Sequence, residues 1–138
     1  MDVTLTCQEP LEKKCKKTIV LNPETKLIHE LLLSIGVPPN INGYCYIAYS
    51  MELILKEPEY LQSVTKGLYI DVAKHFNTKP ACVERAIRFA INNAWQYGDK
   101  YYIQSIFKNC VRLNKNVPTN SVFLARLFYY ITNMEYYK

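Results

Sequence analysis

Five polar or sulfur-bearing side chains share one side of a helix predicted from about Pro80 to Tyr97, opposite an apolar stripe. The set consists of Cys82, Glu84, Arg85, Arg88 and Asn92. Arginine can grip the O6 and N7 atoms of guanine with its forked guanidinium, and glutamate can accept a hydrogen bond from N4 of cytosine. We interpret the first four as candidates for reading base edges in the DNA major groove.

The same side chains also allow a simpler interpretation. Glu84 and Arg88 stand four residues apart, so they could form a surface ion pair that contributes roughly a few tenths of a kcal/mol to helix stability. Charged faces are common on helical hairpins of every function. Spacing alone therefore leaves base reading and a structural surface pair both open.

Two predicted helices must position this face. The first runs from about Thr65 to Phe76 and turns Leu68, Val72 and Phe76 to one side. The second ends at Gly98, and its inward-facing residues are Val83, Ile87, Ala90, Ile91 and Ala94. Val72 and Phe76 of the first helix, with Val83, Ala86 and Ile87 of the second, would form a shared core.

The break between these helices has the chemistry of a tight turn. Asn77 tolerates left-handed backbone geometry better than most residues, Thr78 is a good N-cap candidate, and Pro80 suits a first helical turn. Ala73 supplies a small side chain where the two helices must cross. This spacing predicts a helix-turn-helix.

Positive charge is concentrated around the predicted hairpin. The chain carries a net charge of +5, yet the segment from Ser63 to Lys115 has nine basic residues against three acidic ones. A polyanion-binding face requires such a concentration, although a solvated surface would also show it. Our candidates for contacts with the DNA backbone are Thr65, Lys66, Lys79, Asn92, Lys115 and Asn120.

The remaining sequence predicts an all-α protein with a single compact domain of about six helices. Further helices are expected from Pro23 to Ile35, from Gly43 to Lys56, from Lys100 to Phe107, and after an N-cap at Thr119 or Asn120. We expect the domain to span residues 27–138, and residues 1–26 to form a basic N-terminal extension.

Several other classes of protein are disfavoured. No apolar run is long enough to cross a bilayer and no secretory signal is evident, so we expect a cytoplasmic protein. The five cysteines lack metal-site spacing and are interpreted as reduced thiols, mostly in the core. No phosphate-cradling loop or nucleophile elbow occurs, so we expect no catalytic residues, metal or cofactor. Trp95 is expected in the core.

The chain resembles a known family, the DNA-binding C-terminal effector domain of the master response regulator of endospore formation in bacilli and clostridia. The resemblance extends from about Leu27 to Leu127. Its most specific segments are Val83-Glu-Arg-Ala-Ile-Arg88 and Pro118-Thr-Asn-Ser121. Other matching segments are Ile35-Gly-Val-Pro38, Gly43-Tyr44 with Tyr46, Thr65-Lys66, Asp71-Val-Ala-Lys74, Phe76-Asn-Thr78 and Ala94-Trp95.

The resemblance implies a six-helix domain whose recognition helix enters the major groove at short boxes similar to TGTCGAA. It implies that Glu84 and Arg85 read bases, and that Arg88, Thr65 and Lys66 lie in or beside the DNA surface. It also implies tandem arrangement on DNA, with contacts partly through the last helix.

Departures from the family pattern predict an altered or relaxed box preference. Cys82 stands in place of an arginine, Asn42 in place of a lysine and Phe89 in place of a histidine. The family's receiver domain is missing from the sequence, so we expect DNA binding without phosphorylation.

The sequence thus predicts a sequence-specific transcriptional regulator that binds double-stranded DNA and is not an enzyme. Its protein partners would be a second copy on tandem sites or a full-length regulator. The alternative is an interaction protein that antagonises a full-length regulator by pairing with it. The departures at positions 82 and 42 favour the alternative slightly, and the retained Glu84, Arg85 and Arg88 favour DNA binding.

Overall fold

The computed structural model describes residues 23–107 and 117–136, and this part of the chain contains helices and no strand. The six α-helices are α2 (Pro23–Ile35), α3 (Asn42–Lys56), α4 (Tyr69–Phe76), α5 (Pro80–Tyr97), α6 (Lys100–Phe107) and α7 (Asn120–Tyr136). The prediction of an all-α protein with about six helices is confirmed.

The segment before α4 differs from its prediction. A single helix was expected from Thr65, but the structure has a 3-10 helix at Pro58–Gln62 and a turn of π-helix at Val64–Leu68 that leads into α4. The Tyr60 hydroxyl donates a hydrogen bond to the Asp71 carboxylate of α4 and thereby ties the 3-10 segment to the hairpin. Such a long-range bond leaves no periodic signal in the sequence.

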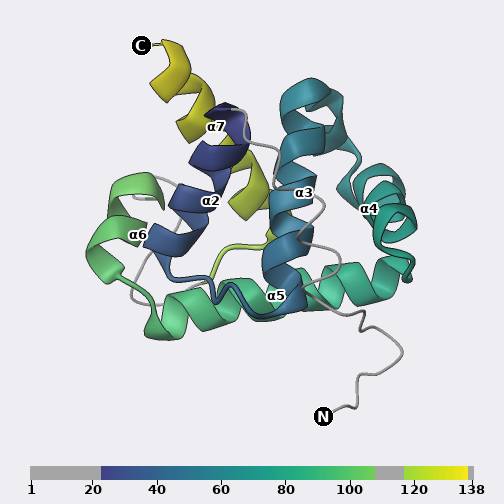
Figure 1. Cartoon of the computed structure of the whole chain (residues 1–138), viewed down its shortest axis with the longest axis horizontal. Helices are drawn as coiled ribbons and strands as arrows, with labels where there is room; N and C mark the ends of the chain where they lie inside the picture. The colour runs from purple at the N-terminus through teal and green to yellow at the C-terminus, as the bar shows by residue number, and fades with distance from the viewer. Residues whose placement is uncertain (1–22, 108–116, 137–138) are drawn as a thin grey trace.

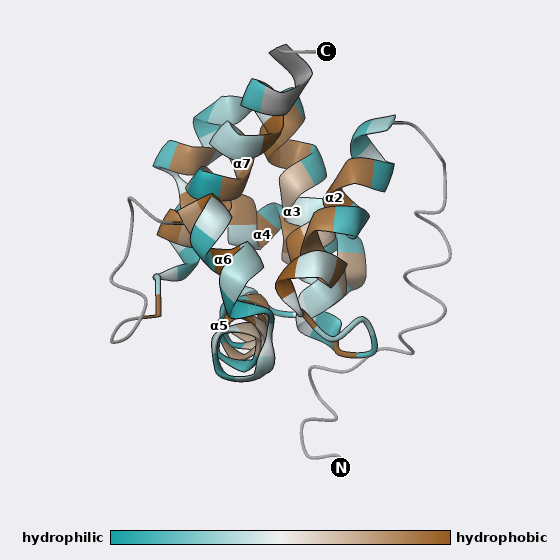
Figure 2. Ribbon diagram, turned by 90° about the vertical axis from the view of Figure 1, so that its left-hand side faces the viewer, coloured by the Kyte–Doolittle hydropathy of each residue, from teal (hydrophilic) through white to brown (hydrophobic). Residues whose placement is uncertain are grey.

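Helix α5 lies along one side of the molecule, crosswise to α2 and α3 (Figure 1). In Figure 2, which looks nearly along α5, the other described helices all lie to one side of it. Helix α3 is central and packs against α2, α5 and α7. The helix that carries the candidate base contacts therefore has one face toward the core and one face toward solvent.

A close approach of backbones fixes α3 onto α5. A Cβ atom at Gly43, in the first turn of α3, would lie against the carbonyl oxygen of Ala86 and only 2.8 Å from the Cβ of Ala90. Glycine is required here because any side chain would push the two helices apart. The small residues Ala86 and Ala90 complete the crossing from the side of α5.

The turn between α4 and α5 was predicted correctly at Asn77, whose backbone is left-handed with φ 59° and ψ 52°. The N-cap prediction at Thr78 was wrong. Lys79 holds that position in an extended conformation, and the Thr78 hydroxyl is buried with no hydrogen-bond partner among the described residues. Because Pro80 is the first residue of α5, the capping position falls on the residue just before it.

The carboxyl end of α5 is anchored by aromatic packing. Trp95 lies in the core as predicted, with its ring centroid 5.0 Å from that of Phe107. Phe107 of α6 and Phe123 of α7 stack with centroids 5.3 Å apart. These three rings join three helices, so this end of α5 is held by buried apolar area.

Candidate nucleic-acid interface

The apolar face of α5 is buried as the sequence predicted. Val83, Ile87, Ala90, Ile91 and Ala94 are each 0% exposed. Val83 and Ile87 lie in the same core as Val72, Ala73 and Phe76 of α4, whereas Ala86 is only partly buried. The helix-turn-helix therefore has the internal packing expected for a rigid support.

The opposite face of α5 presents Arg85, Arg88 and Asn92 to solvent, and Glu84 is half-buried at its margin. Among the described residues, the Arg85 side chain takes part in no hydrogen bond or ion pair. Its five N–H donors are thus available to an external acceptor.

Cys82 was predicted on this exposed face, and that prediction was wrong. Its side chain is only 5% exposed, and it is disulfide-bonded, as is Cys45 of α3. The prediction that these two cysteines are reduced thiols was also wrong. Cys82 lies one residue before the buried Val83, at the edge of the apolar stripe, so a short side chain there turns inward. It cannot reach a base edge in this structure.

Glu84 and Arg88 form the ion pair that their spacing allows. Their side chains are 35% and 54% exposed, so water screens the attraction and the pair adds little stability. The pair holds both groups on one side of α5, beside Arg85. Because breaking an exposed ion pair costs little free energy, either side chain could leave the other and bind an external polar group instead.

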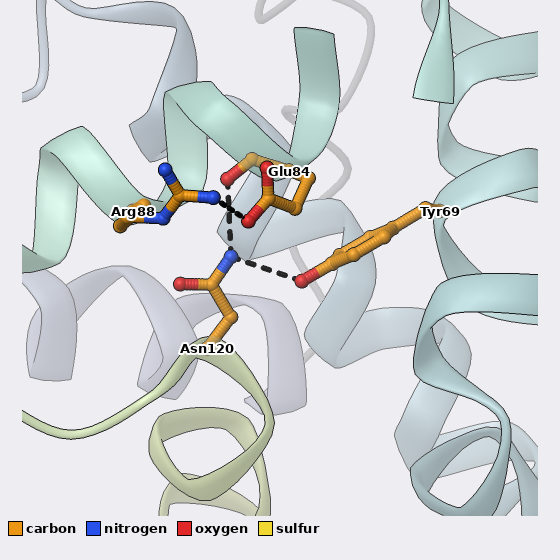
Figure 3. A network of polar contacts seen from close by, with 4 residues as sticks. All are labelled: Tyr69, Glu84, Arg88 and Asn120. Carbon is orange, nitrogen blue, oxygen red and sulfur yellow. Dashed lines mark hydrogen bonds and ion pairs between the residues drawn. The ribbon is translucent and has the colours of Figure 1, made fainter. Parts of the chain in front are cut away.

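Asn120 was predicted to contact the DNA backbone, but its amide is engaged inside the protein (Figure 3). Its Nδ2 donates to the hydroxyl oxygen of Tyr69, 2.9 Å away, and to the backbone carbonyl of Glu84, 3.0 Å away. Asn120 is 8% exposed, and burial raises the pKa of the Tyr69 hydroxyl. The prediction of a DNA-backbone contact is therefore corrected: the Asn120 side chain joins α4, α5 and α7.

Sequence reasoning missed this junction. Thr119 is the residue that caps α7, since its hydroxyl accepts from the N–H of Val122 at 3.2 Å. That leaves the Asn120 side chain free to reach back to α5. The signal was present in the sequence as a second capping-type residue beside the first, but spacing did not show which of them would turn inward.

The other backbone candidates among the described residues lie on the surface. Lys79 is exposed at the amino end of α5, where the helix dipole also favours an anion. Thr65 and Lys66 are exposed on the π-helical turn and line a shallow hollow with Ser121 of α7. Asn92 is exposed two turns beyond Arg85. Lys115 lies outside the described residues.

Two helices joined by a short turn, with a packed inner face and a basic outer face on the second helix, are the arrangement of a helix-turn-helix DNA-binding domain. Residues 28–131 match the family described as sporulation initiation factor Spo0A C terminal. The chain belongs to this family, which comprises DNA-binding effector domains of sporulation regulators and is not a family of enzymes. In the described part of the chain, no helix is both long and apolar enough to cross a membrane.

Proposed function

We propose that this chain is a sequence-specific transcriptional regulator that inserts α5 into the DNA major groove and reads a base through Arg85. The observation that carries the proposal is the position of Arg85. It is exposed on the face opposite the core, and no described residue engages its guanidinium. An exposed guanidinium of this kind can donate two hydrogen bonds at once, to the O6 and N7 atoms of guanine.

Neighbouring side chains extend the proposed contact. Glu84 accepts from a cytosine amino group or orients Arg88, with which it is already paired. Thr65, Lys66, Lys79 and Asn92 contact phosphates on either side of the groove and set the position of α5 along the duplex. The described helices leave the outer face of α5 uncovered, so none of them has to move before this face meets DNA (Figure 2).

The test is binding of the purified chain to a duplex that contains TGTCGAA and to a scrambled duplex, each at several salt concentrations. Arg85→Ala should abolish the preference, at a cost of about 1–3 kcal/mol. The matched control is Lys26→Ala, which removes an exposed cation from the first turns of α2. It should leave the preference unchanged.

The results separate the outcomes clearly. Because an altered box preference is expected, the duplex series also changes each base pair of TGTCGAA in turn. Equal and steeply salt-dependent binding to all of these duplexes would show phosphate attraction without base reading and would contradict the proposal. Absence of binding to either duplex would contradict it fully and would favour the second candidate.

The second candidate is a pairing protein that acts through α7. The observation in its favour is that α7 exposes Val122 and Tyr129, which lie seven residues apart and thus on the same side of the helix. Such a surface suits a second copy on tandem sites or the corresponding helix of a full-length regulator. A pull-down with a full-length regulator in the absence of DNA tests it. Val122→Ser with Tyr129→Ser should abolish the pairing.

A further inference from the structure

Phe89 is a large apolar side chain in the middle of the polar face of α5. It is 57% exposed, and it is not among the residues packed on the core. It follows Arg85 by four residues, which places it about 6 Å farther along the helix axis and turned by about 40°. Its ring therefore lies on the face that is proposed to enter the groove.

The exposure of Phe89 differs in kind from that of the exposed tyrosines near the end of α5. Tyr97 and Tyr101 are more exposed, at 73% and 83%, but each carries a hydroxyl that water can solvate. Phe89 has no polar atom, and its neighbours Arg85, Arg88 and Asn92 are polar and exposed. A phenyl ring at this point is stabilised only when an apolar group covers it.

The major groove offers one apolar group on its base edges, the 5-methyl group of thymine. We propose that Phe89 packs against a thymine methyl and is a specificity-determining residue for the base pair next to the one read by Arg85. This inference rests on the proposed function, since it requires α5 to lie in the groove.

The experiment removes the methyl group from the DNA and the ring from the protein separately. Each thymine of a duplex with a single TGTCGAA box is replaced in turn by deoxyuridine, which differs only by the absence of the methyl. The wild-type chain should bind about fourfold more weakly at one position, as expected for the loss of one buried methyl contact. Phe89→Ala should bind the thymine and deoxyuridine duplexes equally.

Two further variants make the result specific. Phe89→Leu keeps an apolar side chain and should retain part of the thymine preference, and it also serves if Phe89→Ala folds poorly. Tyr97→Ala removes an exposed ring from another side of α5 and should behave as wild type.

The outcomes distinguish this inference from the proposed function. If the wild-type chain prefers the box but no deoxyuridine weakens binding, or if the penalty persists in Phe89→Ala, the thymine contact is wrong and the proposed function stands. A uniform loss of affinity in Phe89→Ala with the same deoxyuridine penalty would mean a contact other than the methyl. If the wild-type chain does not prefer the box to a scrambled duplex, both fail together.

Discussion

The two ends of α5 are stabilised by different means. At the carboxyl end, Trp95 packs edge-on against Phe107, and Phe107 stacks on Phe123. At the amino end, the backbone of Glu84 accepts a hydrogen bond from Asn120, and small apolar side chains pack against α4. The carboxyl end is held by aromatic packing, whereas the amino end combines apolar packing with a directional hydrogen bond from Asn120 and with the disulfide-bonded Cys82.

This difference separates stability from recognition along a single helix. A hydrogen bond depends on direction as well as distance, so it adds a constraint on orientation to the close packing that holds the whole helix. The candidate base contacts at positions 84, 85 and 88 all lie at the amino end, where Asn120 adds this constraint through the backbone of Glu84. The following variants test this separation.

The largest effect should come from Phe123→Ala. The side chain is fully buried between Trp95 and Phe107, so its removal leaves a cavity and should lower the free energy of unfolding by about 3–5 kcal/mol. Chemical denaturation measures this. The folded fraction should still prefer the box over the scrambled duplex by the wild-type ratio. A changed ratio would show that the aromatic end also shapes recognition.

Asn120→Ala should have an intermediate effect on stability and, unlike Phe123→Ala, should reduce box preference. It removes a buried amide that donates both to the Tyr69 hydroxyl and to the Glu84 carbonyl, at a cost of about 1–3 kcal/mol in unfolding free energy. The control is Thr119→Ala, which removes the α7 cap at a cost of about 1 kcal/mol, because the exposed Thr119 hydroxyl accepts from the N–H of Val122 within α7. Equal box preference in the two variants would refute an orienting role for Asn120.

Lys79, just before α5, and Lys100, just after it, should differ in their effect on the salt dependence of DNA binding. Lys79→Ala removes an exposed cation at the amino end and should reduce the slope of log affinity against log salt by about 1. Lys100→Ala should leave the slope unchanged, because its Nζ donates to the carbonyls of Trp95 and Gln96 at the other end. Equal slopes for both variants would contradict the assignment of DNA contact to the amino end.

The smallest effect on stability is expected for Glu84→Gln. It removes one charge of the exposed pair with Arg88, so the free energy of unfolding, measured by thermal denaturation, should fall by roughly 0.2–0.5 kcal/mol. A loss above about 1 kcal/mol would mean that the pair is structural rather than available to DNA.

Sequence periodicity predicted most of this fold because it depends on local spacing. The bounds of α5, its buried stripe and the left-handed Asn77 follow from residues that lie close together in the chain. The errors are of two kinds, contacts over long sequence distance and positions at the margin of a helix or of its apolar stripe, such as Thr78 and Cys82. Asn120 reaches residues 36 and 51 positions away. Cys82 lies at a margin of the stripe, where helical spacing alone does not decide between core and solvent.

The division of α5 into a buried face and an exposed face also bears on how such a domain can diverge. Arg85, Phe89 and Asn92 are exposed, so exchanging them costs the fold little. Under the proposed function, a lineage can therefore sample new target sequences at Arg85 and Phe89 one substitution at a time, while Gly43 and Ala90 keep α5 at the same distance from α3. The helix crossing preserves the shape of the domain, and the exposed residues of the outer face can change together with the DNA sequences that they are proposed to contact.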